Sequence, residues 1–329
     1  MADFQNITIL GGGIMGLMAA YMLADDHDVT LYDPLGFPAD NASWMAGGML
    51  APYSEIEHMD MEWVRAGLAS IEVLRGVPLN LGFSQEGSLL LACPEDRHIL
   101  ERFRGHLPPE QAALRDAREV EAQIDPKFQS GVFLSGEAHL NPHKTMHALC
   151  DYLREHANVT LVSEAFDRGD DALVIDCRGM AAGDDDLRGV KGETVLVRNA
   201  DFSLSRPVRV MHPRYPLYII PRDDHVFLIG ATIIEAGDSY GVTIRSAMEL
   251  MSALYALSPS FADAEVLEVK AGVRPSYADN LPRICVKGNV VSCNGLFRHG
   301  FLLAPIMAEC VREHLAGRVH EFAPLLMKE

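Results

Sequence analysis

A glycine-rich turn near the start of the chain constrains the fold more than any other feature. The apolar segment Asn6–Leu10 runs into Gly11-Gly12-Gly13-Ile14-Met15-Gly16, and an apolar helical segment, Leu17–Ala24, follows. In a βαβ unit, the first glycine permits the tight turn, the second lets the backbone approach a pyrophosphate, and the third allows close helix–strand packing. The start of such a helix binds phosphate through its free N–H groups. The sequence therefore predicts a dinucleotide-binding unit.

The segment after this helix completes the predicted unit. Val29–Tyr32 reads as a second strand and ends in Asp33, about 20 residues beyond the turn, where a carboxylate accepts a ribose hydroxyl. The turn and Asp33 do not decide between a nicotinamide and a flavin dinucleotide.

Composition and charge narrow the class of protein. The chain has 329 residues, of which 48% are hydrophobic, and a formal net charge of −18. This length suits two packed domains, and the negative charge argues against nucleic acid or an anionic membrane as partner. No apolar run reaches membrane-spanning length, and no basic leader precedes the first strand, so a cytoplasmic protein is expected. The six cysteines show neither CxxC nor metal-ligand spacing, and we expect no metal site.

Helical and strand patterns alternate along the chain, which favours an α/β fold. Helices are predicted over 61–75, from Asn141-Pro142 onward, over 244–257 and over 304–315, with two charged helical stretches between 95 and 124. Strands are predicted over 87–92, 159–161, 172–176, 265–273 and 290–292. Residues 131–140 read as strand and turn, and 193–230 as an antiparallel sheet.

These patterns predict an interrupted two-domain arrangement. Residues 1–78, 141–192 and 283–329 are assigned to a nucleotide-binding domain, and residues 79–140 and 193–282 to a substrate-binding domain.

A second glycine-rich segment favours a flavin over a nicotinamide. Ala42-Ser43-Trp44-Met45-Ala46-Gly47-Gly48-Met49 follows the Asp33 strand end. Small residues let the backbone lie flat against a planar ring, and their N–H groups can donate to ring heteroatoms. A nicotinamide-binding domain has no need of such a loop, whereas an extended isoalloxazine has.

Three side chains are candidates for binding a substrate carboxylate. Arg274, in Gly272-Val273-Arg274-Pro275, is predicted to project from a strand end, and Arg298 lies at a strand-to-helix passage. The planar guanidinium makes two parallel hydrogen bonds to a carboxylate, although an arginine taken alone is most often a surface or salt-bridge residue. Tyr218 and Ile220 share one face of a strand, so Tyr218 is either a hydrogen-bond donor to substrate or a packing residue.

The histidines give a weaker signal. His143 and His147 share a helix face at spacing i, i+4 but have no evident third ligand, so a solvated face is the simpler interpretation. His299 either faces the flavin or makes a structural hydrogen bond. No GxSxG, P-loop or HExxH motif occurs.

Taken together, these motifs resemble the D-amino acid oxidase superfamily of FAD-dependent oxidoreductases, and within it the glycine oxidases of thiamin biosynthesis. The resemblance covers most of the chain. It is carried by the two glycine-rich segments, Tyr218-Ile219-Ile220-Pro221-Arg222, Gly230-Ala231-Thr232, Gly272–Pro275 with Asp279–Pro282, and Phe297–Pro305. It implies a Rossmann-like FAD-binding domain of the glutathione-reductase type, interrupted by a substrate domain with a mainly antiparallel β-sheet.

The resemblance also implies roles for individual residues. Arg274 matches the arginine that pairs with the substrate carboxylate, Tyr218 the tyrosine that supports it, and Arg298 a second arginine on the substrate side. The positions that match contacts to a non-covalent FAD are Gly11, Gly13, Ile14, Met15, Gly16, Asp33, Pro34, Ala42, Ser43, Gly47, Gly48, Met49, Leu296, Phe297, Arg298, His299, Gly300, Phe301 and Leu302.

The implied activity is oxidation of a small amino acid, glycine first, to its imine, with dioxygen reduced to hydrogen peroxide. Thiazole synthase is a candidate partner, and a homo-oligomer is expected. An oxidase or dehydrogenase of another amine, such as sarcosine, a D-amino acid or proline, is the alternative. The chain departs from the pattern at Ile233, where a methionine is expected in the substrate pocket, at Asp33, where glutamate is usual, and in its shortness between residues 159 and 172.

Overall fold

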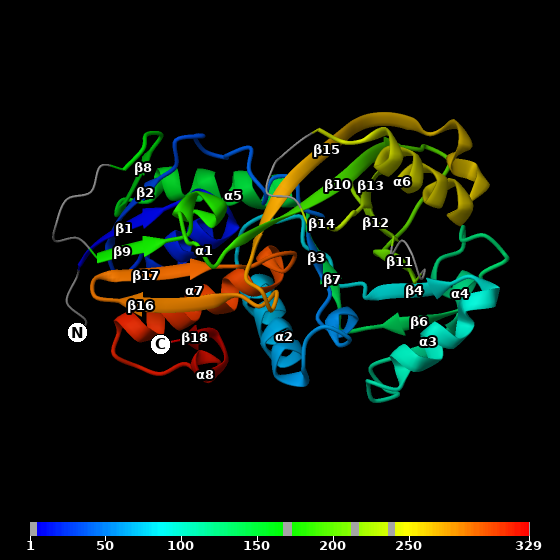
Figure 1. Ribbon diagram of the computed structural model, residues 1–329, viewed down its shortest axis with the longest axis horizontal. Helices are drawn as coiled ribbons and strands as arrows, with labels where there is room; N and C mark the ends of the chain where they lie inside the picture. The colour runs from blue at the N-terminus through cyan, green and yellow to red at the C-terminus, as the bar shows by residue number, and fades with distance from the viewer. Residues whose placement is uncertain (1–4, 167–172, 212–216, 236–240, 329) are drawn as a thin grey trace.

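Two β-sheets organise the protein into two lobes (Figure 1). The structure, a computed structural model, describes residues 5–166, 173–211, 217–235 and 241–328. The long strands β10 (Arg188–Arg198) and β15 (Glu265–Ser276) pair antiparallel and extend between the lobes. Within the described ranges, no helix combines the length and apolar character needed to cross a membrane.

The first sheet holds the predicted dinucleotide-binding unit. Its strands lie in the order β18-β16-β17-β9-β1-β2-β8, and β1 pairs in parallel with both β2 and β9. Their bounds are β1 (Asn6–Leu10), β2 (Asp28–Tyr32), β8 (Val159–Val162), β9 (Leu173–Asp176), β16 (Arg283–Lys287), β17 (Val290–Asn294) and β18 (Met327–Lys328). The predicted return of the 159–161, 172–176 and 290–292 strands to this sheet is confirmed, although Ala172 lies outside the described residues.

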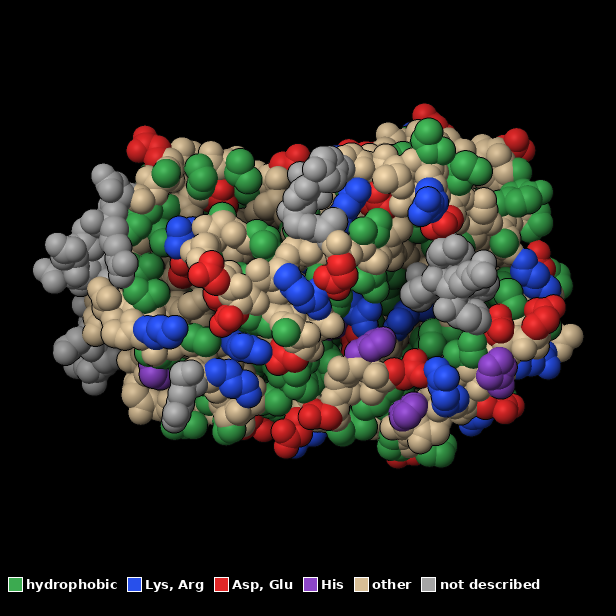
Figure 2. All heavy atoms as spheres, in the orientation of Figure 1, with side chains coloured by type: hydrophobic (Ala, Val, Ile, Leu, Met, Phe, Trp, Pro, Cys, Tyr) green, Lys and Arg blue, Asp and Glu red, His purple; other side chains and the backbone are tan. Residues whose placement is uncertain are grey.

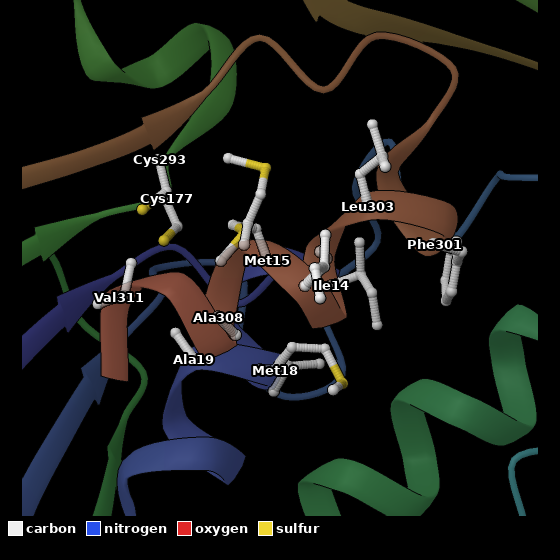
Figure 3. Close-up of a cluster of buried hydrophobic side chains, with 14 of the residues drawn as sticks. Ile14, Met15, Met18, Ala19, Cys177, Cys293, Phe301, Leu303, Ala308 and Val311 are labelled. Carbon is white, nitrogen blue, oxygen red and sulfur yellow. The ribbon is translucent and has the colours of Figure 1, made fainter. Parts of the chain in front are cut away.

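Helices cover this sheet and bring two helix N-termini to one edge of it. The helices are α1 (Ile14–Leu23), α2 (Met61–Gly76), α5 (Pro142–Glu155), α7 (Gly300–Leu315) and the short α8 (Ala323–Leu326). α5 begins where predicted, because Asn141 accepts hydrogen bonds from the N–H groups of His143 and Lys144. Figure 3 shows α1 and α7 packed together through apolar side chains, beside Cys177 and Cys293 of the sheet region.

The second sheet is mainly antiparallel, as predicted. Its order is β14-β10-β13-β12-β11-β4-β6-β5, with β15 on β10, and the described pairing of β4 with β11 is parallel. The remaining strands are β4 (Ser88–Ala92), β5 (Ala113–Asp116), β6 (Ser130–Leu134), β11 (Val208–Met211), β12 (Leu217–Pro221), β13 (Val226–Gly230) and β14 (Ile234–Glu235). Helices α3 (Arg97–Arg104), α4 (Ala117–Val120) and α6 (Ile244–Leu257) accompany it.

The remaining elements are short. β3 (Met49–Leu50) pairs with β7 (Ala138–His139). Single turns of 3₁₀ helix occur at η1 (Tyr53–Glu55), η2 (Pro94–Asp96), η3 (Gly179–Ala182) and η4 (Pro259–Asp263).

Two predicted elements differ from the structure, and one strand was not predicted. β15 continues through Arg274 and Pro275 to Ser276, because it pairs with β10 alone, and an edge strand tolerates a residue without an N–H group. α7 begins at Gly300 rather than at 304. The two charged helical stretches are present as α3 and α4, and between them residues 113–116 form the unpredicted strand β5, which pairs with β6.

The predicted domain boundary after residue 192 falls inside β10. Because all of β10 belongs to the second sheet, we propose that the nucleotide-binding domain ends before Arg188.

Candidate functional site

A cavity of about 1210 Å³ connects the glycine turn with the second sheet. All the predicted FAD-contacting residues except Gly16 line it, together with Tyr218 and Arg274. Gly16 packs behind the turn instead, where an added Cβ would overlap the Gly11 carbonyl oxygen. Segments separated by nearly the whole chain therefore meet around one space.

The turn is held in shape by the neighbouring strand. Gly11 has a φ of +100° and donates its N–H to the Tyr32 carbonyl at 2.8 Å. The Asp33 carboxylate accepts from the N–H groups of Gly12, at 2.6 Å, and Leu35, at 2.9 Å. Asp33 thus fixes the turn, and the unused lone pairs of its carboxylate suit the predicted ribose hydroxyl.

Ser43 joins the second glycine-rich segment to the start of α1. Gly13, the N-cap residue, has no side chain, and the Ser43 hydroxyl accepts the Ile14 N–H at 3.0 Å in its place. The segment therefore begins at the same helix terminus that is predicted to bind the pyrophosphate.

Gly47 and Gly48 are required by close packing. A Cβ at Gly47 would lie 2.6 Å from Ile220 Cδ1 and 3.4 Å from Tyr218 Cε2, so Tyr218 and Ile220 share one face, as predicted. Gly48 has a φ of +75°. The buried Arg222 guanidinium donates to the carbonyls of Gly47, at 2.5 Å, and Leu140, at 3.0 Å, which anchors the loop. Burial lowers the pKa of Arg222 to about 10.

Arg274 also lines the cavity, directly over Gly192. A Cβ at Gly192 would overlap the guanidinium, which is hydrogen-bonded to the Tyr218 side chain and to the Thr232 carbonyl at 3.2 Å. Burial lowers the pKa of Arg274, and the interaction with the Tyr218 side chain partly offsets this lowering. Among the residues that the structure describes, no carboxylate lies within ion-pair distance of Arg274.

Arg298, in contrast, is already paired. Its guanidinium forms an ion pair with Glu55 of η1, and His299 Nε2 lies 3.3 Å from the same carboxylate oxygen. Burial by itself would raise the pKa of Glu55, but Arg298, His299 and Arg209 outweigh it and hold the pKa well below its usual range. The sequence suggested Arg298 for a substrate carboxylate, whereas the structure gives it a protein carboxylate.

Two buried atoms of this segment support a bound group beside it. In the described part of the chain, Arg298 Nε and His299 Nδ1 are buried and have no hydrogen-bond partner. Such atoms are costly unless something satisfies them. Together with the glycine turn at the opposite end and the glycine cradle between, they fit a dinucleotide that carries a polar ring system.

Glu55 and Arg209 line the cavity but were missed by sequence reasoning, and so was Glu137, which is buried outside the cavity lining. Glu55 and Arg298 are 243 residues apart, and no local motif marks either Glu55 or Glu137. Only the meeting of η1, β11 and the Arg298 segment at the cavity shows the roles of Glu55 and Arg209. His143 and His147 lie on an exposed face of α5, as expected, and the His143 ring stacks on Trp44 with a centroid separation of 3.8 Å. In the described ranges no group of three His, Cys, Asp or Glu side chains could hold a metal.

Glu137 predicts a pH dependence of stability. Its fully buried carboxyl accepts hydrogen bonds from Ser54 and Ser88, and burial, opposed by those bonds and by Arg209, raises its pKa to about 7. Because the folded-state pKa exceeds the unfolded one, the native state holds the proton more tightly and loses stability as the pH rises toward 7. We expect the free energy of unfolding to fall by about 2 kcal/mol between pH 5.5 and 7.5.

Urea unfolding across this pH range measures the effect. Glu137→Gln, which cannot ionise, should flatten the profile, while Glu95→Gln, on the exposed η2 turn, should leave it unchanged. An equally steep profile in Glu137→Gln would assign the pH dependence to another group.

The sequence is similar to known flavoenzymes over nearly its whole length. Residues 6–314 match the DAO family, described as FAD dependent oxidoreductase. The thiamine biosynthesis oxidoreductase ThiO of Rhizobium etli is 39% identical over 94% of this chain and 96% of its own length. The glycine oxidase of Pseudomonas aeruginosa is 25% identical over 95% of both chains. A bifunctional protein ThiO/ThiG of Trichormus variabilis is 29% identical over 41% of this chain and 21% of its own length.

The fold has a close match among solved structures. The crystal structure of glycine oxidase from Geobacillus kaustophilus superposes with a TM-score of 0.84 over 99% of both chains, at 23% identity. The family match and the near-full-length relative together identify the chain: it belongs to the DAO family of FAD dependent oxidoreductases.

Proposed function

We propose that this protein oxidises a small amino acid, most directly glycine, to its imine and reduces dioxygen to hydrogen peroxide. The observation that carries the proposal is Arg274, a guanidinium without an ion-pair partner in the described residues, held against Tyr218 at the cavity. Arg274 is half-buried in the cavity wall, and a partly desolvated cation without a carboxylate is costly unless a ligand supplies one. An amino acid carboxylate has the charge and geometry required.

The residues of the chain would orient the substrate. Arg274 binds the carboxylate, and the Tyr218 hydroxyl, already hydrogen-bonded to Arg274, supports it. This leaves the amine and the Cα–H bond on the side of residues 296–302. When bound, FAD supplies the redox chemistry, taking up the substrate hydride and passing the electrons to dioxygen. No dedicated general base is needed, so the contribution of the protein is orientation and electrostatics.

The places of the lining residues in the cavity support an assignment of the FAD contacts. Gly11, Gly13 and the start of α1 would hold the pyrophosphate, Asp33 the ribose, and Gly47, Gly48 and the 296–302 segment the ring. Arg298 would contact the ring through its unsatisfied Nε while Glu55 retains its other end. We assign no adenine contact, because residues 167–172 lie outside the described ranges.

The relatives support a place in thiamin synthesis. The R. etli relative is named as a thiamine biosynthesis oxidoreductase, and the T. variabilis relative is named as a bifunctional ThiO/ThiG protein. We therefore propose that the imine is passed to a thiazole synthase, and that the protein acts in the cytoplasm.

A panel of amines tests the function. The purified protein should show a flavin spectrum and release its yellow colour into the supernatant on acid precipitation. It should also produce peroxide with glycine, sarcosine, proline and D-alanine, and the rate should be highest with glycine. Reduction by glycine without air, followed by rapid reoxidation in air, identifies an oxidase, whereas slow reoxidation identifies a dehydrogenase. A flavin-loaded protein that none of these amines reduces would contradict the proposal.

A further inference from the structure

The cavity does not end at Tyr218. Beyond it, the space continues toward η1, α3 and β11, which contribute Glu55, His58, Ile99, Arg102, Arg209 and Met211 to its lining. Figure 2 shows basic and histidine side chains gathered in the hollow between the two lobes. The FAD assigned above does not use this part, and glycine is too small to fill it.

Arg209 stands next to Tyr218 in this extension. In the β11–β12 pair the two residues are directly opposite each other, so their side chains lie on the same face of the sheet. One nitrogen of Arg209, Nη1, donates to the Ser54 carbonyl at 2.9 Å. Tyr218 therefore has one arginine at its hydroxyl, Arg274, and a second beside it on the sheet.

The charges at this end of the cavity do not balance. Arg298 is paired with Glu55, and Arg102 is paired with Glu57 at 3.0 Å. Among the residues that the structure places, neither Arg274 nor Arg209 has a carboxylate within 4.0 Å. Glu55 and Glu137 act on Arg209 only from longer range. A substrate with one carboxylate would neutralise Arg274 and leave Arg209 unmatched.

We propose that Arg209 is a specificity-determining residue that binds a second substrate carboxylate, so that the preferred substrates are short amines bearing two carboxylates. The inference rests on the proposed function, since it assigns the first carboxylate to Arg274. The planar fork of Arg209 keeps donors free after its bond to Ser54, and these suit a carboxylate. The extension beyond Tyr218 provides the room that the second group needs.

Kinetics on matched substrates test this assignment. The flavin-loaded enzyme is assayed with glycine and sarcosine, which carry one carboxylate, and with iminodiacetate and D-aspartate, which carry two. We expect kcat/KM for a dicarboxylate to exceed that for glycine at least tenfold. In Arg209→Ala, the ratio of the two values should fall at least tenfold, and Arg209→Lys should restore part of it. Arg198→Ala, on the exposed face of β10, is the control.

Binding of unreactive acids provides a readout that does not depend on turnover. Calorimetry with the holoenzyme should give a Kd for malonate at least tenfold below that for acetate, and Arg209→Ala should remove most of this difference. Should Arg209→Ala fail to fold, Arg209→Gln replaces it. If glycine is oxidised but neither ratio changes in the variant, Arg209 only supports Ser54 and the inference is wrong. If no amine is oxidised, the proposed function fails, and the malonate-to-acetate ratio still decides the role of Arg209.

Discussion

Replacing Arg274 by alanine is expected to lower kcat/KM for glycine at least tenfold, and by about 100-fold if the charged hydrogen bonds contribute fully. A hydrogen bond to a charged group contributes about 1.5–3 kcal/mol, which corresponds to this range of rate constants. The effect should be large because the guanidinium is half-buried in the cavity wall, and the described residues offer it no carboxylate. Water that replaces the side chain cannot supply the fixed bidentate geometry.

Steady-state peroxide release measures the loss, with flavin content recorded for each variant. Arg198→Ala removes an exposed arginine that is paired with Glu265, so it controls for the loss of one positive charge. Gly192→Ala tests the same assignment without replacing Arg274. The new Cβ would overlap the Arg274 guanidinium and displace it. Unchanged kinetics in Arg274→Ala, with flavin retained, would remove Arg274 from the site.

Replacing Gly16 by alanine should destabilise the nucleotide-binding lobe by about 3 kcal/mol or more and deplete bound flavin. The Cβ would overlap the Gly11 carbonyl oxygen, which is backbone and cannot rotate away. Overpacking of a tight core costs about 1–3 kcal/mol, and rigid backbone neighbours place this position at the upper end. The shift that relieves the overlap must separate α1 from the turn, the contact that positions the pyrophosphate site.

Gly76→Ala is the matched control, because Gly76 also lies in a helix but an added Cβ would meet nothing within 4 Å. Thermal unfolding and the ratio of flavin to protein absorbance give the two readouts. A Gly16→Ala protein with wild-type stability and full flavin content would show that the turn does not depend on this contact.

Local sequence patterns were sufficient to predict the elements whose conformation depends on neighbouring residues in the chain. The glycine turn, the apolar β1 and α1 segments and the Asn141 cap each specify a conformation within a few residues, so the sequence predicted the dinucleotide-binding unit and the start of α5. The alternation in β12 likewise predicted that Tyr218 and Ile220 share a face. Strand β5 was not predicted, because its pairing with β6 gives residues 113–116 their conformation and no local pattern marks them as a strand.

The sequence by itself determined the class of cofactor site and named Arg274, Tyr218 and Arg298 as candidates. Only the tertiary structure decided what those side chains face. It paired Arg298 with Glu55, which lies 243 residues away, left Arg274 without a carboxylate in the described residues, and set Arg209 opposite Tyr218. The physical reason is that charge compensation depends on distance in space, and no spacing along the chain records which distant carboxylate reaches which guanidinium.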